Sequence, residues 1–383
     1  MVKNWPEAAR LSGAALLILA LAGCGLSTGV VPPPAGSAAK PTASKPKASA
    51  SGPQLAWHSH HPNPYLPGDV LIADAGNNRI LLVTPGKRIV WQFPKAGQPS
   101  PLYDNDDVFF GPHFDEIITN QENNQMISII NFNQEKIVWN YGHAGTPGTA
   151  PGYLHTPDDA FLYDRAGGQI ITVADIYNQR ILFISRSTHQ IVRQYGQTRH
   201  YDNNPPASYA APNGDFPAPN QGTLITSIGG NDAILVNRSG QVVWTVHFPS
   251  YLSFPSDANF TPHGNVIVAF YTKPGAILKI SPQGKILWLY RLTSGPGALN
   301  QPSLAVELPN GLIMANDDQN DRVIIIDPKT NQIVWQYGHT GVEGTAPGYL
   351  NDPDGIDFLP IGVTPGGNNP IGHHLWSYPG NGY

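Results

Sequence analysis

Residues 327–335 read Asp-Pro-Lys-Thr-Asn-Gln-Ile-Val-Trp, and the end of this stretch, a branched apolar residue before Trp, recurs along the chain. Within residues 68–360 Val or Leu precedes Trp at five places, and Val192-Arg193 fills the one gap. The six copies end at positions 91, 139, 193, 244, 288 and 335, which are 48, 54, 51, 44 and 47 residues apart. A period of this length indicates a repeated supersecondary unit.

Each unit contains four short apolar or alternating runs separated by turn residues. In the third unit the runs are Ala160 to Tyr163, Gln169 to Ala174, Arg180 to Ser185 and Gln190 to Tyr195. The 40 glycines and 38 prolines of the 383 residues argue against a helical protein, because both residues are costly inside helices. The sequence therefore predicts an all-β fold, a six-bladed β-propeller of four-stranded antiparallel blades.

The two ends of the repeat region predict how the ring closes. The first unit begins at Gly68-Asp69-Val70 with no strand before it, while Pro353-Asp354-Gly355-Ile356 after the last Trp matches the opening of the third unit. We expect residues 354–359 to complete the first blade as its innermost strand, so that no sheet edge stays open. The propeller then spans residues 54–383.

A second motif links Asp to Asn three residues later and then to Arg. It resembles the signature of NHL-repeat propellers, and the outer-strand phrase at 327–335 is similar to that of quinoprotein-like and arylsulfotransferase propellers. Physically, the Asp or Asn can cap a turn while the Arg reaches across the hairpin, so we interpret the motif as architectural. Its members are Asp74, Asn77, Arg79, Asp175, Asn178, Arg180, Asp317, Asn320 and Arg322.

The resemblance predicts the fold more firmly than an activity. Arylsulfotransferase propellers depend on channel histidines, whereas the inner strands here begin with Asp and Ser. Quinoprotein dehydrogenases generally use eight blades and a set of residues that clamps the cofactor, which we cannot place on this sequence. We therefore expect no PQQ.

The N-terminal residues predict export and lipidation. An apolar run of about a dozen residues, too short to span a bilayer, is followed by Leu21-Ala22-Gly23-Cys24, which resembles the bacterial lipobox. Residues 1–23 are then a signal peptide, and Cys24, the only cysteine, carries a lipid that holds the protein on the extracytoplasmic side of the membrane. Residues 24–53, rich in Pro, Ala, Ser and Lys, read as a disordered tether.

Strand direction predicts two unequal faces. The inter-blade linkers and the turns between second and third strands share one face, which we call the loop-rich face; the remaining turns share the opposite, plain face. Two linkers, 141–160 and 337–356, agree at 13 of 20 positions. We expect ligands on the loop-rich face, with His143, Tyr153, His155, His339 and Tyr349 as contact residues.

The inner strands begin with acids at the channel mouth. Aligning Gly214-Asp215 with Asp158-Asp159 places a carboxylate on five blades, and the candidate residues are Asp107, Asp159, Asp215, Asp257 and Asp354. Two interpretations stay open. Each Asp can simply cap its own strand, which we prefer, or the ring can hold a hard cation such as Ca²⁺.

Composition narrows the function further. A net charge of -5 and the lack of a basic patch on a folded segment argue against nucleic acid. Within residues 54–383 no Gly-x-Ser-x-Gly, His-Glu-x-x-His or P-loop sequence is present. We therefore expect a monomeric binding or scaffold module for a protein, peptide or glycan, rather than an enzyme. The alternative is a metal-dependent lactonase-, lyase- or hydrolase-like propeller with the acids as ligands and His143 or His339 as base.

Overall fold

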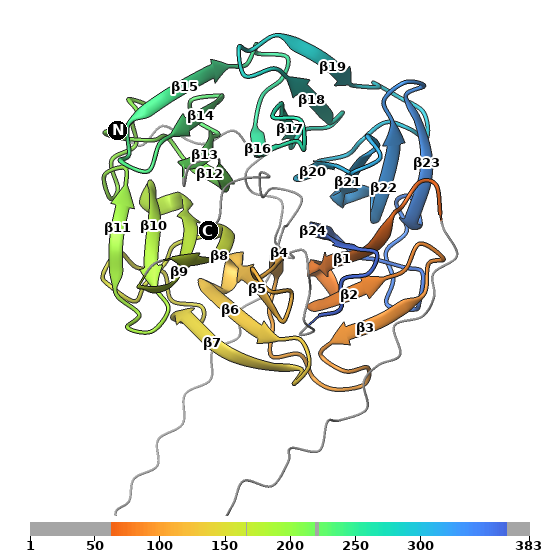
Figure 1. Ribbon diagram of the computed structural model, residues 1–383, viewed down its shortest axis with the longest axis horizontal. Helices are drawn as coiled ribbons and strands as arrows, with labels where there is room; N and C mark the ends of the chain where they lie inside the picture. The colour runs from red at the N-terminus through yellow and green to blue at the C-terminus, as the bar shows by residue number, and fades with distance from the viewer. Residues whose placement is uncertain (1–62, 166, 219–221, 366–383) are drawn as a thin grey trace, which may run out of the picture. The chain divides into compact units, whose positions relative to one another are not determined.

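The computed structural model of the chain describes residues 63–165, 167–218 and 222–365. The predicted signal peptide, Cys24 and the tether lie outside these residues. The described chain forms six four-stranded antiparallel sheets arranged in a ring, as predicted (Figure 1). Among the described residues, no helix has both the length and the hydropathy needed to cross a membrane.

The blades are numbered from the first strand pair, and each is given from its inner to its outer strand. Blade 1 is β24 (Pro353–Pro360), β1 (Gly68–Asp74), β2 (Arg79–Val83) and β3 (Ile89–Phe93); blade 2 is β4 (Asn105–Phe110), β5 (Glu116–Gln121), β6 (Met126–Asn131) and β7 (Lys136–Gly142); blade 3 is β8 (Pro157–Arg165), β9 (Gly168–Asp175), β10 (Arg180–Ser185) and β11 (Ile191–Tyr195). Blade 4 is β12 (Pro212–Ala218), β13 (Gly222–Ser227), β14 (Asp232–Val236) and β15 (Val242–His247); blade 5 is β16 (Pro255–Phe260), β17 (Val266–Phe270), β18 (Ala276–Ile280) and β19 (Ile286–Tyr290); blade 6 is β20 (Ala305–Glu307), β21 (Ile313–Asp317), β22 (Arg322–Asp327) and β23 (Gln332–Gly338).

Strand sequence follows position in the blade. A second strand such as β1 is buried along its whole length, whereas the outer strand β7 alternates buried Trp139 and Tyr141 with exposed residues. In a strand with one solvent-exposed face, apolar and polar residues alternate, whereas a strand covered on both faces has a continuous apolar run. The sequence signal of the outer strands therefore arises because they form the rim.

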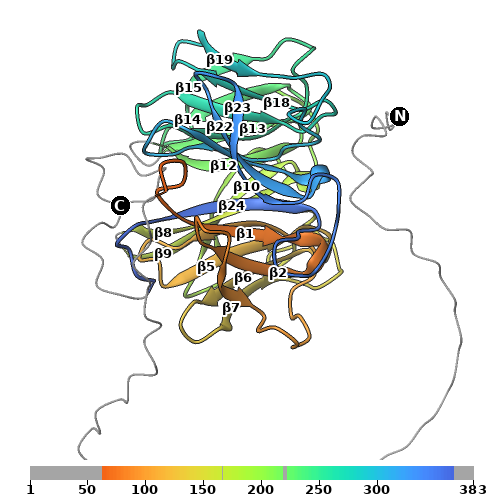
Figure 2. The same ribbon diagram turned by 90° about the vertical axis from the view of Figure 1, so that its right-hand side faces the viewer.

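The C-terminal strand closes the ring. β24 pairs antiparallel with β1 from Gly68 opposite Pro360 to Asp74 opposite Pro353, with a slip between Ala73 and Asp74. Figures 1 and 2 both show β24 beside β1. The predicted strand 354–359 is confirmed, with one further residue at each end.

Short 3-10 turns connect second and third strands in four blades, at Ala75–Asn77, Glu122–Asn124, Ile176–Asn178 and Asp318–Asn320. Each is followed by a non-glycine residue in the left-handed conformation, such as Asn78 with φ 52°. These turns lie where the inner strand begins, because Pro157 at the start of β8 pairs with Asp175 at the end of β9. The channel mouth and these turns therefore share the loop-rich face.

Candidate cation site at the channel mouth

The strand pairing slips at the beginning of the inner strands. The slip falls between Asn105 and Val108 in β4, between Asp158 and Ala160 in β8, and between Pro255 and Ala258 in β16. A β-bulge leaves a residue out of the ladder and re-aims its side chain, and bulges are common beside functional sites. Asp159, the residue left out in β8, has φ 35°, a conformation that non-glycine residues rarely adopt.

The observed register corrects one alignment made from the sequence. Pro212 pairs with the last residue of β13 as Pro157 pairs with the last residue of β9. Gly214, not Asp215, therefore occupies the place of Asp159, and Asp215 lies one residue further along its strand. The sequence alignment was wrong because blade 4 has one more residue between its proline and its aspartate.

Three carboxylates from different blades converge at this level. One oxygen each of Asp107, Asp159 and Asp257 lies within 4.8 Å of the other two, and Asp106, Asp107 and Asp158 form a second such group. Because Ca²⁺ binds oxygen at 2.3–2.6 Å, oxygens up to about 4.8 Å apart can share one ion. Gly214 completes the wall of the first group, since a Cβ there would lie 3.2 Å from Asp257 Oδ1 and 3.3 Å from Asp159 Oδ2.

These carboxylates are buried without full compensation. The exposed fractions of Asp107, Asp159 and Asp257 are 2%, 0% and 1%. Among the described residues, the Oδ1 atom of each has no hydrogen-bond partner. None of the three takes part in an ion pair among the described residues. An unpaired buried acceptor is costly, so these atoms are suited to a ligand that supplies positive charge.

The electrostatics lead to the same conclusion. Burial raises the pKa of Asp159 well above the usual aspartate range, and the carboxylates of Asp257 and Asp107 raise it further. The pKa of Asp107 and that of Asp257 are raised in the same way, by burial first and then by neighbouring carboxylates. Without a cation, the group must hold protons that free aspartates would have lost.

Further acids lie around the mouth that the sequence analysis did not single out. Glu122 and Asp318 are the first residues of two equivalent 3-10 turns, in blades 2 and 6. Burial, followed by the carboxylates of Asp354 and Asp352, raises the pKa of Asp318 well above its usual range. For Asp318 the signal was available in the sequence, because it directly follows Asp317, the first position of the Asp-x-x-Asn motif, whereas Glu122 follows Gln121. Asp354 itself is half-buried and lies outside the two three-carboxylate groups.

The repeat motif holds the linkers in place. In blade 3, Asp175 Oδ2 accepts hydrogen bonds from Asn178 Nδ2 at 2.9 Å and from Arg180 Nε at 2.7 Å. Asn178 and Arg180 in turn donate to backbone carbonyls of the preceding linker, at Gly148, Thr149 and Tyr153. The trio Asp74, Asn77 and Arg79 and the trio Asp317, Asn320 and Arg322 make equivalent contacts.

The predicted loop residues lie in those linkers rather than at the carboxylates. The His143 ring stacks on Tyr153 with centroids 4.0 Å apart, and the His339 ring lies against Tyr349 at 4.2 Å. The His155 ring meets the edge of Tyr177, and burial followed by Arg199 lowers the pKa of His155. Within the described residues, neither metal-capable group contains a histidine.

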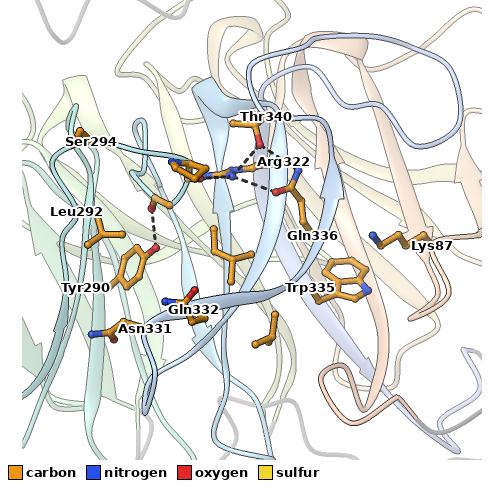
Figure 3. A pocket seen from close by; sticks show the side chains of 14 residues that line it. Lys87, Tyr290, Leu292, Ser294, Arg322, Asn331, Gln332, Trp335, Gln336 and Thr340 are labelled. Carbon is orange, nitrogen blue, oxygen red and sulfur yellow. Dashed lines mark hydrogen bonds between the residues drawn. The ribbon is translucent and has the colours of Figure 1, made fainter.

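A pocket of about 630 Å³ lies on the rim, between the outer strands of blades 5 and 6 (Figure 3). Tyr290, Trp335, Gln336 and Lys87 are among its lining residues. None of the mouth carboxylates lines it. The pocket and the carboxylates are therefore separate features.

Comparisons with protein-family models and with curated proteins gave no match. A protein of unknown function from Bacteroides caccae superimposes with a TM-score of 0.53 at 16% identity, over 76% of this chain and 98% of that chain. A virginiamycin B lyase from Staphylococcus aureus gives 0.44 at 16% identity, over 68% and 85%. A streptogramin B lyase structure gives 0.43 at 14% identity, over 61% and 68%. At 16% identity, the similarity to the Bacteroides caccae protein shows the fold alone.

Proposed function

We propose that this chain is a lipid-anchored, extracytoplasmic binding module whose loop-rich face is organised by a divalent cation, Ca²⁺ by preference. The cation would be held by Asp107, Asp159 and Asp257. The observation that carries the proposal is that each of these three carboxylates is buried and has one oxygen that no group of the described residues hydrogen-bonds. A hard cation satisfies clustered carboxylate oxygens, which strand capping alone does not.

The ion would link blades as well as bind. Its three carboxylate ligands come from the inner strands of blades 2, 3 and 5, so the bonds to a single ion would join strands that are far apart in sequence. Binding to the folded state stabilises it by about 2.7 kcal/mol at a ligand concentration one hundred times Kd. The loops around the mouth would then present a fixed surface to a protein, peptide or glycan.

A binding role is favoured over the enzyme alternative by the position of the histidines. An enzyme of the kind considered would bring a base to the metal ligands. The rings of His143 and His339 instead pack on tyrosines of their own linkers. The proposal therefore assigns these His–Tyr pairs to the recognition surface.

The test is calorimetric titration of metal-free protein with Ca²⁺, together with melting in EDTA and in excess Ca²⁺. We expect binding near one equivalent and a higher Tm with Ca²⁺. The double variant Asp159→Asn, Asp257→Asn should lose both effects and melt higher than the wild type in EDTA at pH 8, because it removes two buried carboxyl groups whose ionised forms are desolvated and repel each other. Asp202→Asn, at an exposed acid outside the mouth, is the matched control. Identical wild-type melting curves in EDTA and Ca²⁺ would exclude the site.

A further inference from the structure

The outer strand of blade 6 has a free edge. β23 pairs with β22 alone, from Arg322 opposite Gly338 to Asp327 opposite Gln332. Within the described residues, no backbone hydrogen bond joins residues 332–336 to any other segment. A free strand edge exposes backbone N–H and C=O groups with which an extended chain can pair. Every blade has such an outer edge, so the edge alone does not mark a site.

The rim pocket of about 630 Å³ lies along this edge (Figure 3). Residues 332–336 of β23 line it, and their side chains point to both sides of the blade. Ile333 packs against the core cluster that contains Tyr290 of blade 5. Trp335 Nε1 instead donates to the carbonyl of Pro85 at 3.0 Å, in the turn between β2 and β3 of blade 1. A pocket bounded by both faces of one strand runs past the edge of that strand, so it opens onto the backbone of β23.

The two sides of the pocket differ in chemistry. Toward blade 5 it is lined by Tyr290 and by Leu292, whose side chain is 39% exposed. Toward blade 1 it is lined by Lys87, which is exposed and forms no ion pair with the described residues. The other cation of the lining, Arg322, is bonded to Asp317 at 2.7 Å. No Asp or Glu of the described chain lines the pocket, so charge complementarity favours an acidic group beside Lys87.

Hydrogen bonds hold the walls of the pocket in place. The Tyr290 hydroxyl donates to the carbonyl of Gly297 at 2.8 Å. Gln336 Oε1 accepts from Arg322 Nη1 at 3.2 Å, and Gln336 Nε2 donates to Thr340 Oγ1 at 3.3 Å. A site whose side chains are already fixed loses less conformational entropy when a ligand binds.

We propose that the rim pocket is a second interaction site, which binds an extended acidic peptide segment of a partner protein as an added strand beside β23. An apolar side chain of the peptide lies against Leu292, and an Asp or Glu side chain lies beside Lys87. Because neighbouring side chains of a strand point to opposite faces, these two anchors are an odd number of residues apart. The site is separate from the mouth carboxylates and stands whether or not those bind a cation.

The test uses two fluorescein-labelled peptides, Thr-Val-Thr-Leu-Glu-Val-Thr and Thr-Leu-Thr-Val-Glu-Val-Thr, which place Leu one and three residues from Glu. Their binding to the full chain is measured by fluorescence anisotropy. We expect Lys87→Glu to weaken binding of the better peptide at least tenfold, because the charge that attracts the peptide is reversed. Lys285→Glu is the matched control, since Lys285 is an exposed lysine in the corresponding turn of blade 5 and does not line the pocket. It should leave binding unchanged.

Two modified peptides test the contacts separately. A peptide with Lys in place of Glu should bind Lys87→Glu more tightly than it binds the wild type. Only every second N–H group of an added strand points toward β23. N-methylation of one alternate set of residues should therefore abolish binding, while N-methylation of the other set should preserve it.

Several results would overturn the proposal. They are a Kd above about 1 mM for both original peptides, equal binding to Lys87→Glu and the wild type, or equal effects of the two methylation patterns. Sedimentation velocity of the chain alone tests a different occupant. A dimer that Lys87→Glu dissociates would assign the edge of β23 to a second copy of the chain and would also refute the peptide site.

Discussion

Removal of the closing strand is the most direct test of the architecture. A chain that ends at Tyr349 lacks β24 and leaves the inner edge of β1 unpaired along its length. It also loses Leu350, Ile356, Phe358 and Leu359, each at most 2% exposed. At about 1.5–3 kcal/mol for each buried side chain, these four contribute about 6–12 kcal/mol.

That contribution is comparable with the whole stability of a typical domain, about 5–15 kcal/mol. We therefore expect the truncated chain to show no cooperative unfolding transition in urea, followed by circular dichroism and tryptophan fluorescence. A chain that ends at Pro365 keeps β24 and should unfold cooperatively, so it controls for the mere loss of C-terminal residues.

Single substitutions separate strand closure from general damage. Phe358→Ala in the intact chain should lower the free energy of unfolding by about 3–5 kcal/mol, and Ile356→Ala by about 2–5 kcal/mol. A chain ending at Tyr349 that unfolded in one transition at the full-length urea midpoint would refute the closure and its energetics together.

Three further predictions concern charge, the mouth and the anchor. Burial raises the pKa of Asp352 and of Asp357 to about 8, above the unfolded value of 3.8. Their contribution to stability is therefore present below pH 4 and is lost as the pH rises to 8. The free energy of unfolding, measured in urea with EDTA present, should be lower at pH 8 than at pH 5, and the opposite trend would contradict these pKa shifts. Gly214→Ala should weaken Ca²⁺ binding at least tenfold in calorimetry because its Cβ would crowd the carboxylate oxygens, while Gly86→Ala, whose Cβ would meet nothing within 3.4 Å, should not. Cys24→Ser should move the protein from the membrane to the soluble fraction in a folded state, and membrane retention of this variant would count against lipid anchoring.

Much of the fold could be predicted because a propeller repeats one local pattern. The Val-Trp phrase marks the outer strands, in which buried and exposed residues alternate because one side of the strand faces solvent. The match between residues 353–356 and the opening of the third unit predicted β24, since a ring leaves only one partner for an orphan strand. Sequence periodicity thus determined blade number, strand order and closure.

The tertiary structure decided what the repeated residues do. The acids of the channel mouth were visible in the sequence, but the β-bulges of the inner strands decide that the side chains of Asp107, Asp159 and Asp257 converge. The observed register also places Gly214 where the sequence alignment predicted an aspartate. A bulge shifts side-chain direction by one residue, and nothing in the local sequence states its position. Arg193 was an exception in the repeat, and the structure shows that it donates to the carbonyl of Arg238 in blade 4 as Trp335 donates to that of Pro85 in blade 1. The sequence determined the ring because blade patterns are local, whereas charges from different blades meet only once the ring has closed.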